Sequence, residues 1–457
     1  MGDIASGHEC GASAARTRPV SALAARNGGR AGLVALVAIL LLGLGLRADY
    51  AWEGRAPVFD AAAYGRIAQS LDEDRGFTLG RQATQPAGNY SPGLPLFVAG
   101  LYRLSGGVHE RFARVVLALV GALSVLFTYL IGRRLSGPAA GLIGALAVAI
   151  YPAFLEYQGM LMSEPLAATL LSGSVLAMLW AADRPRRLAW LLPGALLGAT
   201  AMVRPEYLAV AVLVAVVVFV RGARVQWSRS LAQAALLLAG VVLVVAPWTI
   251  RNVVALDRFV PISTGGGQVL FAGTYLPSDG DPEKVGEEVV IRHLGIFDPQ
   301  DARRLRLEQI LATLAAHRFP QLESDKALSR MGREQLWNDI AEEPLEYAGF
   351  VATKIGAIWS HGPRDVMRRP IWEALQWALV AFGLLGLIVL ARQRRWEALL
   401  LATVFIAITT ISALLVASPR RVLVMLPLVG ALAGVGTTWA WSYLSQVRTI
   451  ALAKPRP

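Results

Sequence analysis

The chain of 457 residues has little charge and almost no cysteine. Asp, Glu, Lys and Arg make up 17% of it, against about 25% in soluble globular proteins, and 55% of its residues are hydrophobic. The single cysteine, Cys10, excludes a disulfide framework and a thiolate metal cluster. Apolar runs of about 16–22 residues recur through the sequence, which excludes a soluble enzyme and is typical of a polytopic membrane protein.

Signatures of nucleotide and metal binding are also missing. The glycine run Gly265–Gly267 lacks the Lys-Ser/Thr of a P-loop, and no predicted strand precedes it. The five histidines form neither an HExxH motif nor a close pair, which argues against a dedicated zinc site. The sequence therefore predicts no certain cofactor, and it leaves open a divalent metal ion bound by carboxylates.

Ten apolar segments are candidate transmembrane helices. They cover Ala31–Leu46, Phe112–Ile131, Pro138–Pro152, Pro165–Ala182, Leu188–Met202, Tyr207–Val220, Leu231–Trp248, Ile371–Ala391, Ala398–Val416 and Val422–Trp441. With the amino terminus inside, the inner segments hold 18 Lys and Arg against four acids, whereas the long outer segments 48–92 and 250–370 hold 23 acids against 19 bases. The positive-inside rule then places both termini in the cytoplasm.

The formal net charge of +12 follows from this topology. The basic residues flank the spans rather than gathering on one face, so they predict contact with anionic membrane lipids and no nucleic acid partner. The first apolar run resembles a signal-peptide core, but no A-x-A site follows it at Arg47–Trp52, which favours a retained anchor. Arg outnumbers Lys 40 to 4. This excess suggests a GC-rich bacterial gene, and hence the bacterial plasma (inner) membrane.

The predicted fold class is an all-α polytopic membrane protein with about ten transmembrane helices and two long extracytoplasmic segments. Its predicted parts are a cytoplasmic tail (1–30), an amino-terminal transmembrane core (31–249) with a first outer loop (48–107), an outer helical segment (250–370), carboxy-terminal transmembrane helices (371–441) and a cytoplasmic tail (442–457). Helical patterns outside the spans cover Asp60–Leu71, Gly93–Leu104, Ala302–His317, Asp325–Ala341 and Glu346–Trp359. Gly93–Leu104 is too short to span and is expected to be half embedded on the outer face.

Ionisable residues close to the membrane gather on the outer side. Ionisable groups at this depth are functional candidates, so a site that faces outward is expected. The candidates are Asp60, Glu156, Glu164, Arg204, Glu206, Arg251, Glu373, Arg420 and Arg421.

Structural explanations compete with function at several of these positions. Asp60 is equally suited to cap a helix or to act as a base. Glu164 and Glu206 stand in predicted first helical turns, where an acid favours the helix dipole. Arg420 and Arg421 form a basic pair in a short outer loop, against the positive-inside trend, so a phosphate or another anionic partner is the better explanation for them.

Five segments resemble the C-type (GT-C) glycosyltransferases that use polyprenyl-phosphate sugars, in particular bacterial relatives of protein O-mannosyltransferases and of the aminoarabinose transferase that modifies lipid A. The segments are Asp60–Gly76 with Tyr90–Phe97, Tyr151–Pro165, Met202–Glu206, Pro247–Thr264 with Gly265–Gly267, and Pro419–Pro427. The resemblance implies an inverting transfer of one sugar from a polyprenyl monophosphate to an acceptor hydroxyl, with the lipid tail between spans near residues 93–104.

The resemblance also implies roles for single residues. Asp60 would deprotonate the acceptor hydroxyl, which suits a carboxylate within hydrogen-bond reach. Glu164 would orient the acceptor or hold a metal ion. The candidates for binding the donor phosphate are Arg204, Arg251, Arg420 and Arg421. The candidates in the loops around donor and acceptor are Tyr64, Tyr90, Glu206 and Asn252.

The sequence departs from the family pattern at three positions. Ala61 follows Asp60 where some relatives have a second acid, which argues against a two-carboxylate metal site there. Ser91 replaces a frequent basic residue or histidine, and Arg421 replaces an aromatic residue. Recognition of the sugar head is therefore expected to differ.

The acceptor is open between a protein, a glycolipid and a cell-wall glycan, and its choice is expected to fall to residues 250–370. One rival hypothesis is a lipid-linked-sugar flippase or transporter, which predicts mid-span charges, broken helices and internal symmetry. The other is a non-catalytic membrane scaffold, in which Asp60 is only a cap.

Overall fold

The structure, a computed structural model, describes residues 20–453 except 58, 81, 82, 84, 279–281 and 294–306. Cys10, most of the predicted amino-terminal tail and the start of the predicted helix Ala302–His317 lie outside the described residues. The described part is helical, and its only β pairing is the single bridge Thr78–Pro86. The all-α prediction is confirmed.

The helices follow one another along the chain with short connections in the membrane core and longer ones in the outer segments. The α-helices are α1 (Val20–Glu53), α2 (Phe59–Asp72), α3 (Gly93–Ser105), α4 (Glu110–Ser136), α5 (Pro138–Ile150), α6 (Pro152–Glu156), α7 (Ser163–Ala182), α8 (Leu191–Val203), α9 (Tyr207–Leu256), α10 (Gly266–Thr274), α11 (Pro282–His293), α13 (Leu307–Arg318), α14 (Ser324–Glu342), α15 (Pro344–Ser360), α16 (Pro370–Arg392), α17 (Trp396–Leu414) and α18 (Arg420–Ala453). The short 3₁₀ helices are η1 (Tyr157–Gly159), η2 (Arg187–Trp190), η3 (Leu276–Ser278) and η4 (Asp365–Arg368).

Every predicted span is helical, but not every one is a separate long helix. Among the described residues, seven helices are long and apolar enough to cross a membrane: α1, α4, α7, α9, α16, α17 and α18. An eighth span results if α5 and the segment Pro152–Gly159, bent by 55°, are counted as one. The helix α8, even with η2, is shorter, and the 50 residues of α9 contain two predicted spans on either side of the non-helical Gln226 (φ −144°, ψ 76°).

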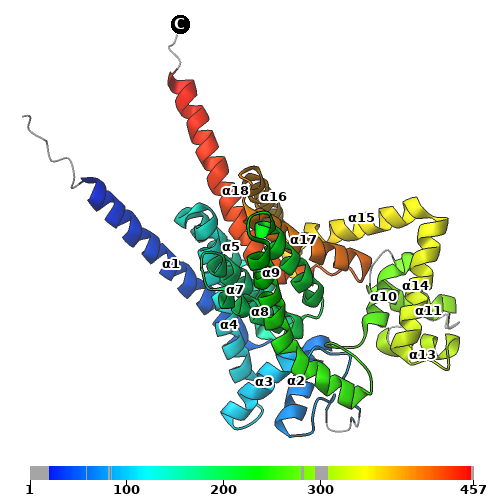
Figure 1. Ribbon diagram of the computed structural model, residues 1–457. Helices are drawn as coiled ribbons and strands as arrows, with labels where there is room; N and C mark the ends of the chain where they lie inside the picture. The colour runs from blue at the N-terminus through cyan, green and yellow to red at the C-terminus, as the bar shows by residue number, and fades with distance from the viewer. Residues whose placement is uncertain are drawn as a thin grey trace, which may run out of the picture.

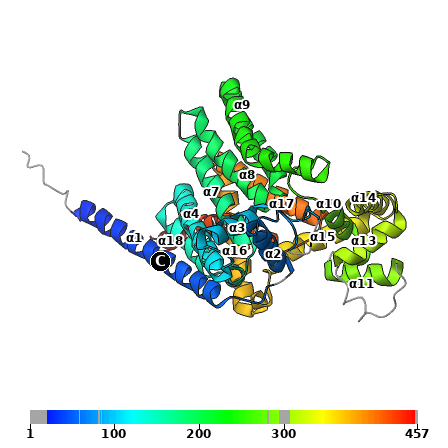
Figure 2. The ribbon, with the colours of Figure 1, turned by 90° about the horizontal axis from the view of Figure 1, so that it is seen from below.

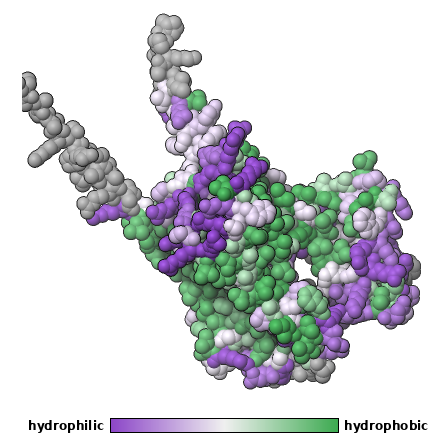
Figure 3. Space-filling model, in the orientation of Figure 1, coloured by the Kyte–Doolittle hydropathy of each residue, from purple (hydrophilic) through white to green (hydrophobic). Residues whose placement is uncertain are grey.

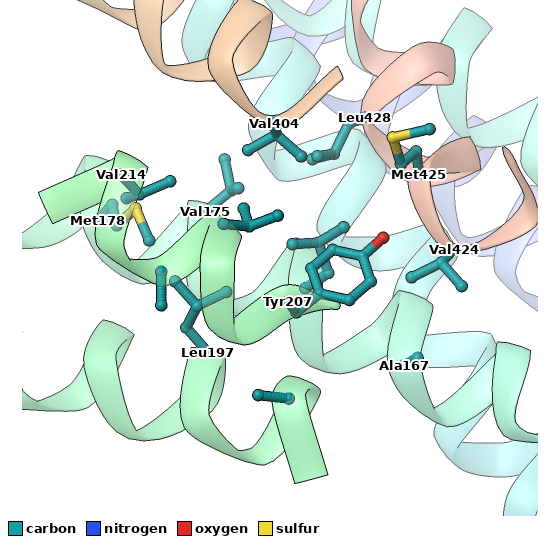
Figure 4. Packing of buried hydrophobic residues seen from close by; sticks show 14 of the residues in the cluster. Ala167, Val175, Met178, Leu197, Tyr207, Val214, Val404, Val424, Met425 and Leu428 are labelled. Atoms are coloured by element: carbon teal, nitrogen blue, oxygen red, sulfur yellow. The ribbon is translucent and has the colours of Figure 1, made fainter. Parts of the chain in front are cut away.

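The helices of the membrane core pack against one another in several extensive pairs. α8 packs along α9, α16 along α18, and α4 and α18 on α5. Buried side chains of α7, α8, α9, α17 and α18 interdigitate at its centre (Figure 4). The contact of α5 with α18 needs glycine, because a Cβ on Gly144 would collide with the backbone of Gly430. Small residues of this kind allow the close approach of membrane helices.

The two outer segments lie at different places around this core. α2 and α3 pack together at the lower end in Figure 1, the end away from the start of α1 and the end of α18. α10, α11, α13 and α14 share a hydrophobic core and form a small bundle beside the membrane helices in Figures 1 and 2. α15 returns the chain to α16. The predicted helices Asp60–Leu71, Gly93–Leu104, Asp325–Ala341 and Glu346–Trp359 are confirmed as α2, α3, α14 and α15, and the described end of Ala302–His317 lies in α13.

The surface has the pattern of a multi-pass membrane protein. Figure 3 shows a broad apolar surface over the helix bundle, with hydrophilic surface near its upper edge, along its lower edge and over the outer bundle. Both described chain ends project from the upper side in Figure 1. Since Arg420 begins α18, it lies at the other end of that helix, away from the described chain ends. The site described next is therefore on the face opposite to both chain ends.

Candidate active site

Six of the predicted site residues come together at that face. They stand where helices begin or are joined: in the first turns of α2, α7 and α18, and in the link between α8 and α9. Each is therefore held by rigid elements on at least one side. The six residues are Asp60, Glu164, Arg204, Glu206, Arg420 and Arg421.

Glu164 is the centre of this group. Its side chain has no exposed surface. Its Oε1 accepts from Arg204 Nη2 and from Arg420 Nε, both at 2.7 Å. A carboxylate is stable at such a buried position only when it is paired and hydrogen-bonded, and here two guanidinium groups satisfy one oxygen. Glu164 therefore fixes the orientation of both arginines.

The other ionic contacts extend this centre into an alternating row. Arg420 Nη1 donates to Asp60 Oδ2 at 2.7 Å. At the other end, Glu206 Oε1 lies 3.5 Å from Arg204 Nη1 and 3.7 Å from Arg421 Nε. We call this row, Asp60–Arg420–Glu164–Arg204–Glu206–Arg421, the ion-pair chain. It contains three carboxylates and three guanidinium groups, so its formal charge is zero.

Burial and charge act in opposite directions on Arg204. Burial disfavours its charged form, but the carboxylates of Glu164 and Glu206 outweigh this cost and raise its pKa above the usual value. Arg204 is therefore a permanent cation at the site.

The ion-pair chain forms one wall of a large cavity, which we call the polar cavity. Its volume is about 1040 Å³. Asp60, Arg204 and Arg420 line one side, while Gln268 of α10 and Leu307 of α13 line it from the outer bundle. Of the three carboxylates in the ion-pair chain, only that of Asp60 lines the polar cavity.

A second cavity, which we call the apolar cavity, lies between α3, α4, α7, α8 and α9. Its volume is about 910 Å³, and its walls are almost entirely hydrocarbon. Met202 and Val203 line the apolar cavity, and the next residue, Arg204, lines the polar one. In α7, likewise, Ser163 faces the polar cavity and Leu166 the apolar one. The linings of the two cavities are therefore adjacent along the chain at Val203–Arg204, where the ion-pair chain stands.

The predicted tyrosines lie beside Asp60. Tyr64 stands one helical turn after Asp60 on α2 and lines the polar cavity. Its ring meets that of Tyr90 edge to face, with 6.0 Å between centroids. Burial, and secondarily the charge of Asp60, raise the pKa of Tyr64, so its hydroxyl stays protonated. Tyr90 does not line the cavity and instead supports Tyr64.

The structure does not bring Arg251 and Asn252 to the ion-pair chain. Arg251 lies over the rings of Trp248 and Phe77, at 4.8 and 5.7 Å, and lines neither cavity. Asn252 is buried, and its Nδ2 donates to the carbonyls of Val260 and Ile262 at 3.1 and 2.9 Å. Asn252 therefore holds the segment that follows α9, whereas Arg251 joins α9 to Phe77 in the loop after α2.

Sequence reasoning missed part of the cavity lining. The loop between α15 and α16 contributes His361, Arg364 and Arg368, and Tyr157 lies beneath the Arg420 guanidinium at 5.8 Å. The signal was available, because this loop, which the sequence predicts to be outside, is rich in arginine against the positive-inside trend, as is the pair Arg420–Arg421. Of the other acids at span ends, Glu373 lines the cavity and Glu156 accepts from Arg364 Nε at 2.8 Å.

No metal centre is apparent at the ion-pair chain. Within the described ranges, no group of three or more His, Cys, Asp or Glu side chains is arranged to hold a metal ion. The carboxylates of the chain point to guanidinium groups instead.

Comparisons with known proteins agree with the sequence motifs. Residues 88–250 match the family model of dolichyl-phosphate-mannose-protein mannosyltransferases. No curated protein matches the sequence significantly. The archaeal oligosaccharyltransferase AglB from Archaeoglobus fulgidus, in complex with an inhibitory peptide and a dolichol-phosphate, is similar over 93% of this chain and 52% of its own, with 16% identity and a TM-score of 0.56. Its apo form gives the same coverage and identity with a TM-score of 0.58.

The chain thus spans about half the length of AglB. ArnT from Cupriavidus metallidurans bound to undecaprenyl phosphate aligns over 89% of this chain and 77% of its own, with 16% identity and a TM-score of 0.42, which is too low to support an inference. The predicted resemblance is confirmed: residues 88–250 match a mannosyltransferase family model, and 93% of the chain shares its fold with AglB.

Proposed function

We propose that the protein is a glycosyltransferase of the bacterial plasma membrane. It moves a single sugar from a polyprenyl monophosphate to an acceptor hydroxyl on the extracytoplasmic face, with inversion at the anomeric carbon. The mannosyltransferase match over residues 88–250 and the fold shared with AglB support this class of reaction.

The observation that carries the proposal is that the apolar lining ends at Val203 and the polar lining begins at Arg204. A ligand with a long hydrocarbon tail and a charged head needs an apolar cavity that opens onto cationic groups. Met202 and Val203 offer the first, and Arg204 and Arg420 offer the second. A polyprenyl-phosphate sugar has this shape, with its tail among α3, α7 and α8 and its phosphate at the two guanidinium groups.

The chemistry then follows from the side chains in the polar cavity. Asp60 takes the proton of the acceptor hydroxyl as its oxygen attacks the anomeric carbon. The new glycosidic bond forms while the bond from that carbon to the phosphate oxygen breaks, and the polyprenyl phosphate leaves with the bonding electrons. Arg420 and Arg204 stabilise the negative charge that develops on it, which preorganised cations do best in a site shielded from water.

Glu164 acts in this proposal as a positioning residue. Because its side chain has no exposed surface, it is not placed to contact an acceptor directly. It holds both guanidinium groups by one oxygen and so fixes their position at the polar cavity, where they meet the phosphate. No nucleotide is needed, since the donor arrives already activated in the membrane.

Native mass spectrometry of the purified protein tests the donor assignment. The protein is released from mild detergent, and its bound lipids are identified by mass and fragmentation. We expect a polyprenyl phosphate, free or carrying one sugar, to copurify with the native protein and to be depleted in Arg420→Gln. If only bulk phospholipids copurify, and added polyprenyl phosphate does not bind, the donor assignment is wrong.

A further inference from the structure

We propose that the donor phosphate replaces Asp60 as the partner of Arg420 Nη1. This exchange frees the Asp60 carboxylate, the proposed base, for the acceptor hydroxyl. This inference rests on the proposed function and adds an order of events to it. The base is ion-paired while the donor is absent and loses that partner when the donor binds.

The ion-pair chain has no net formal charge to attract a phosphate. All three guanidinium groups already have carboxylate partners, at 2.7 to 3.7 Å. An arriving phosphodiester therefore meets no uncompensated cation in the chain. Each guanidinium group keeps unused N–H groups, but its charge is already compensated, so the phosphate gains a full charge-assisted contact only when it replaces one of the carboxylates.

Asp60 is the carboxylate that the phosphate replaces. Glu164 is completely buried between two guanidinium groups, and Glu206 has 15% of its side chain exposed and does not line the polar cavity. Asp60 has 40% exposed and does line it. Exposed ion pairs are weak and buried ones are costly to break, so the pair Asp60–Arg420 is the one that opens.

Arg420 can change partners without moving. Its Nε stays on Glu164 while Nη1 passes from Asp60 Oδ2 to a phosphate oxygen. Asp60, at the start of α2 beside Tyr64, is the partner that gives up the contact. Before the exchange, Oδ2 shares its lone pairs with the guanidinium group. After the exchange, both oxygens of Asp60 face the cavity.

The exchange makes a prediction that runs against intuition, because loss of a residue from the site improves binding of the donor lipid. The probe is undecaprenyl phosphate, titrated against the full-length protein in detergent micelles at fixed salt. We expect Asp60→Asn to bind it about five- to tenfold more tightly than the native protein, the gain that corresponds to removal of one partly exposed competing carboxylate. Asp60→Ala is the second variant, in case the asparagine retains a hydrogen bond to Arg420.

Asp365→Asn is the matched control. Asp365 also lines the polar cavity, but its side chain is 98% exposed and its partner is Arg368, outside the ion-pair chain. The exchange predicts that this variant binds the lipid within about twofold of the native protein, since an exposed charge has little effect. If Asp365→Asn and Asp60→Asn strengthen lipid binding equally, the cause is the overall charge of the cavity, and the proposed exchange is wrong.

Two further outcomes are decisive. If Asp60→Asn and Asp60→Ala are monodisperse and bind undecaprenyl phosphate as well as or less well than the native protein, the phosphate does not compete with Asp60 and the exchange is wrong, while the donor assignment stands. If the folded native protein does not bind the lipid at all, the proposed function fails and the exchange fails with it.

Discussion

Arg420 Nε donates to Glu164 Oε1 at 2.7 Å, although the two residues are 256 positions apart in the chain. The contact joins the first turn of α7 to the first turn of α18. Because Glu164 is completely buried and also accepts from Arg204, one carboxylate fixes two cations at the edge of the polar cavity. In the proposed function, the binding of donor phosphate therefore depends on a residue that the phosphate does not touch.

Glu164→Gln should weaken both the fold and the binding of donor phosphate. Removing one charge of a buried, hydrogen-bonded group costs about 3–5 kcal/mol, because the partners stay buried without compensation. We expect a lower thermal midpoint in detergent and at least about tenfold weaker binding of undecaprenyl phosphate. Glu397→Gln is the control, since Glu397 is also buried and paired with Arg395, at 2.9 Å, but lies outside both cavities. Undiminished lipid binding by Glu164→Gln would contradict the positioning role.

Arg420 and Arg251 should respond differently to the same substitution. Arg420→Gln removes a guanidinium group that lines the polar cavity, and we expect at least about tenfold weaker lipid binding, as for the loss of one charge-assisted contact. Arg251→Gln removes a group that lies on Trp248 and Phe77, so we expect loss of stability with lipid binding within about twofold. Titration of both variants with undecaprenyl phosphate is the measurement. The reverse order of effects would place the phosphate at α9 instead.

A bulky side chain in the apolar cavity should exclude the lipid tail. Ala199 lines this cavity, so Ala199→Phe fills part of its volume with a rigid ring. We expect the copurified polyprenyl lipid to fall by about tenfold, since the tail loses buried hydrocarbon contact. The control is Val242→Phe. Val242 is 59% exposed on a membrane-facing surface of α9, so this variant should bind the lipid normally. Unchanged lipid content in Ala199→Phe would mean that the tail lies elsewhere.

Lys354 should make stability depend on pH. This residue of α15 is 1% exposed, and its Nζ donates to the carbonyl of Gly273 at the end of α10 at 2.6 Å. Burial, helped by the charge of Arg421, lowers the pKa of Lys354 from 10.5 to about 8. Between these values the unfolded chain binds more protons than the folded one, so stability rises with pH.

The expected gain from about pH 7.5 to about pH 9.5 is about 2 kcal/mol. It is measured as a rise of the thermal midpoint in detergent, and Lys354→Met should remove the rise. A native protein whose midpoint is flat or falls over this range, or a Lys354→Met variant that keeps the same slope, would show that Lys354 is not the titrating group.

Much of the fold could be predicted because a bilayer imposes length and apolarity on each span. The apolar runs identified helices in every predicted segment, and the charge asymmetry put Asp60 and Arg420 on one face. The break in α9 was less accessible. Residues 221–229 were expected to form a loop, but they continue the helix on both sides of Gln226. Their polarity indicated the edge of the membrane and carried no information on the backbone conformation.

The site could be predicted only in part, because sequence separation hides contacts. Arg251 was grouped with the phosphate ligands from its place in the chain, but its neighbours Trp248 and Phe77 offered aromatic faces that a guanidinium group binds. Glu164 was expected to orient the acceptor or to hold a metal ion, and nothing in its local sequence indicates that it has no exposed surface. The contribution of Arg364 from a loop more than 200 positions after Glu156 depends on tertiary structure alone.

The most direct test of the whole account is the pool of polyprenyl-phosphate sugars in cells that lack the gene and express either the native protein or Asp60→Asn at matched levels. The account predicts that one lipid-linked sugar accumulates only with Asp60→Asn, because the variant still binds the donor but cannot deprotonate the acceptor. Lipid mass spectrometry reads this directly and identifies the sugar. If the pools are identical while both proteins are folded and equally abundant, Asp60 is not the base, and the flippase or scaffold hypothesis gains ground.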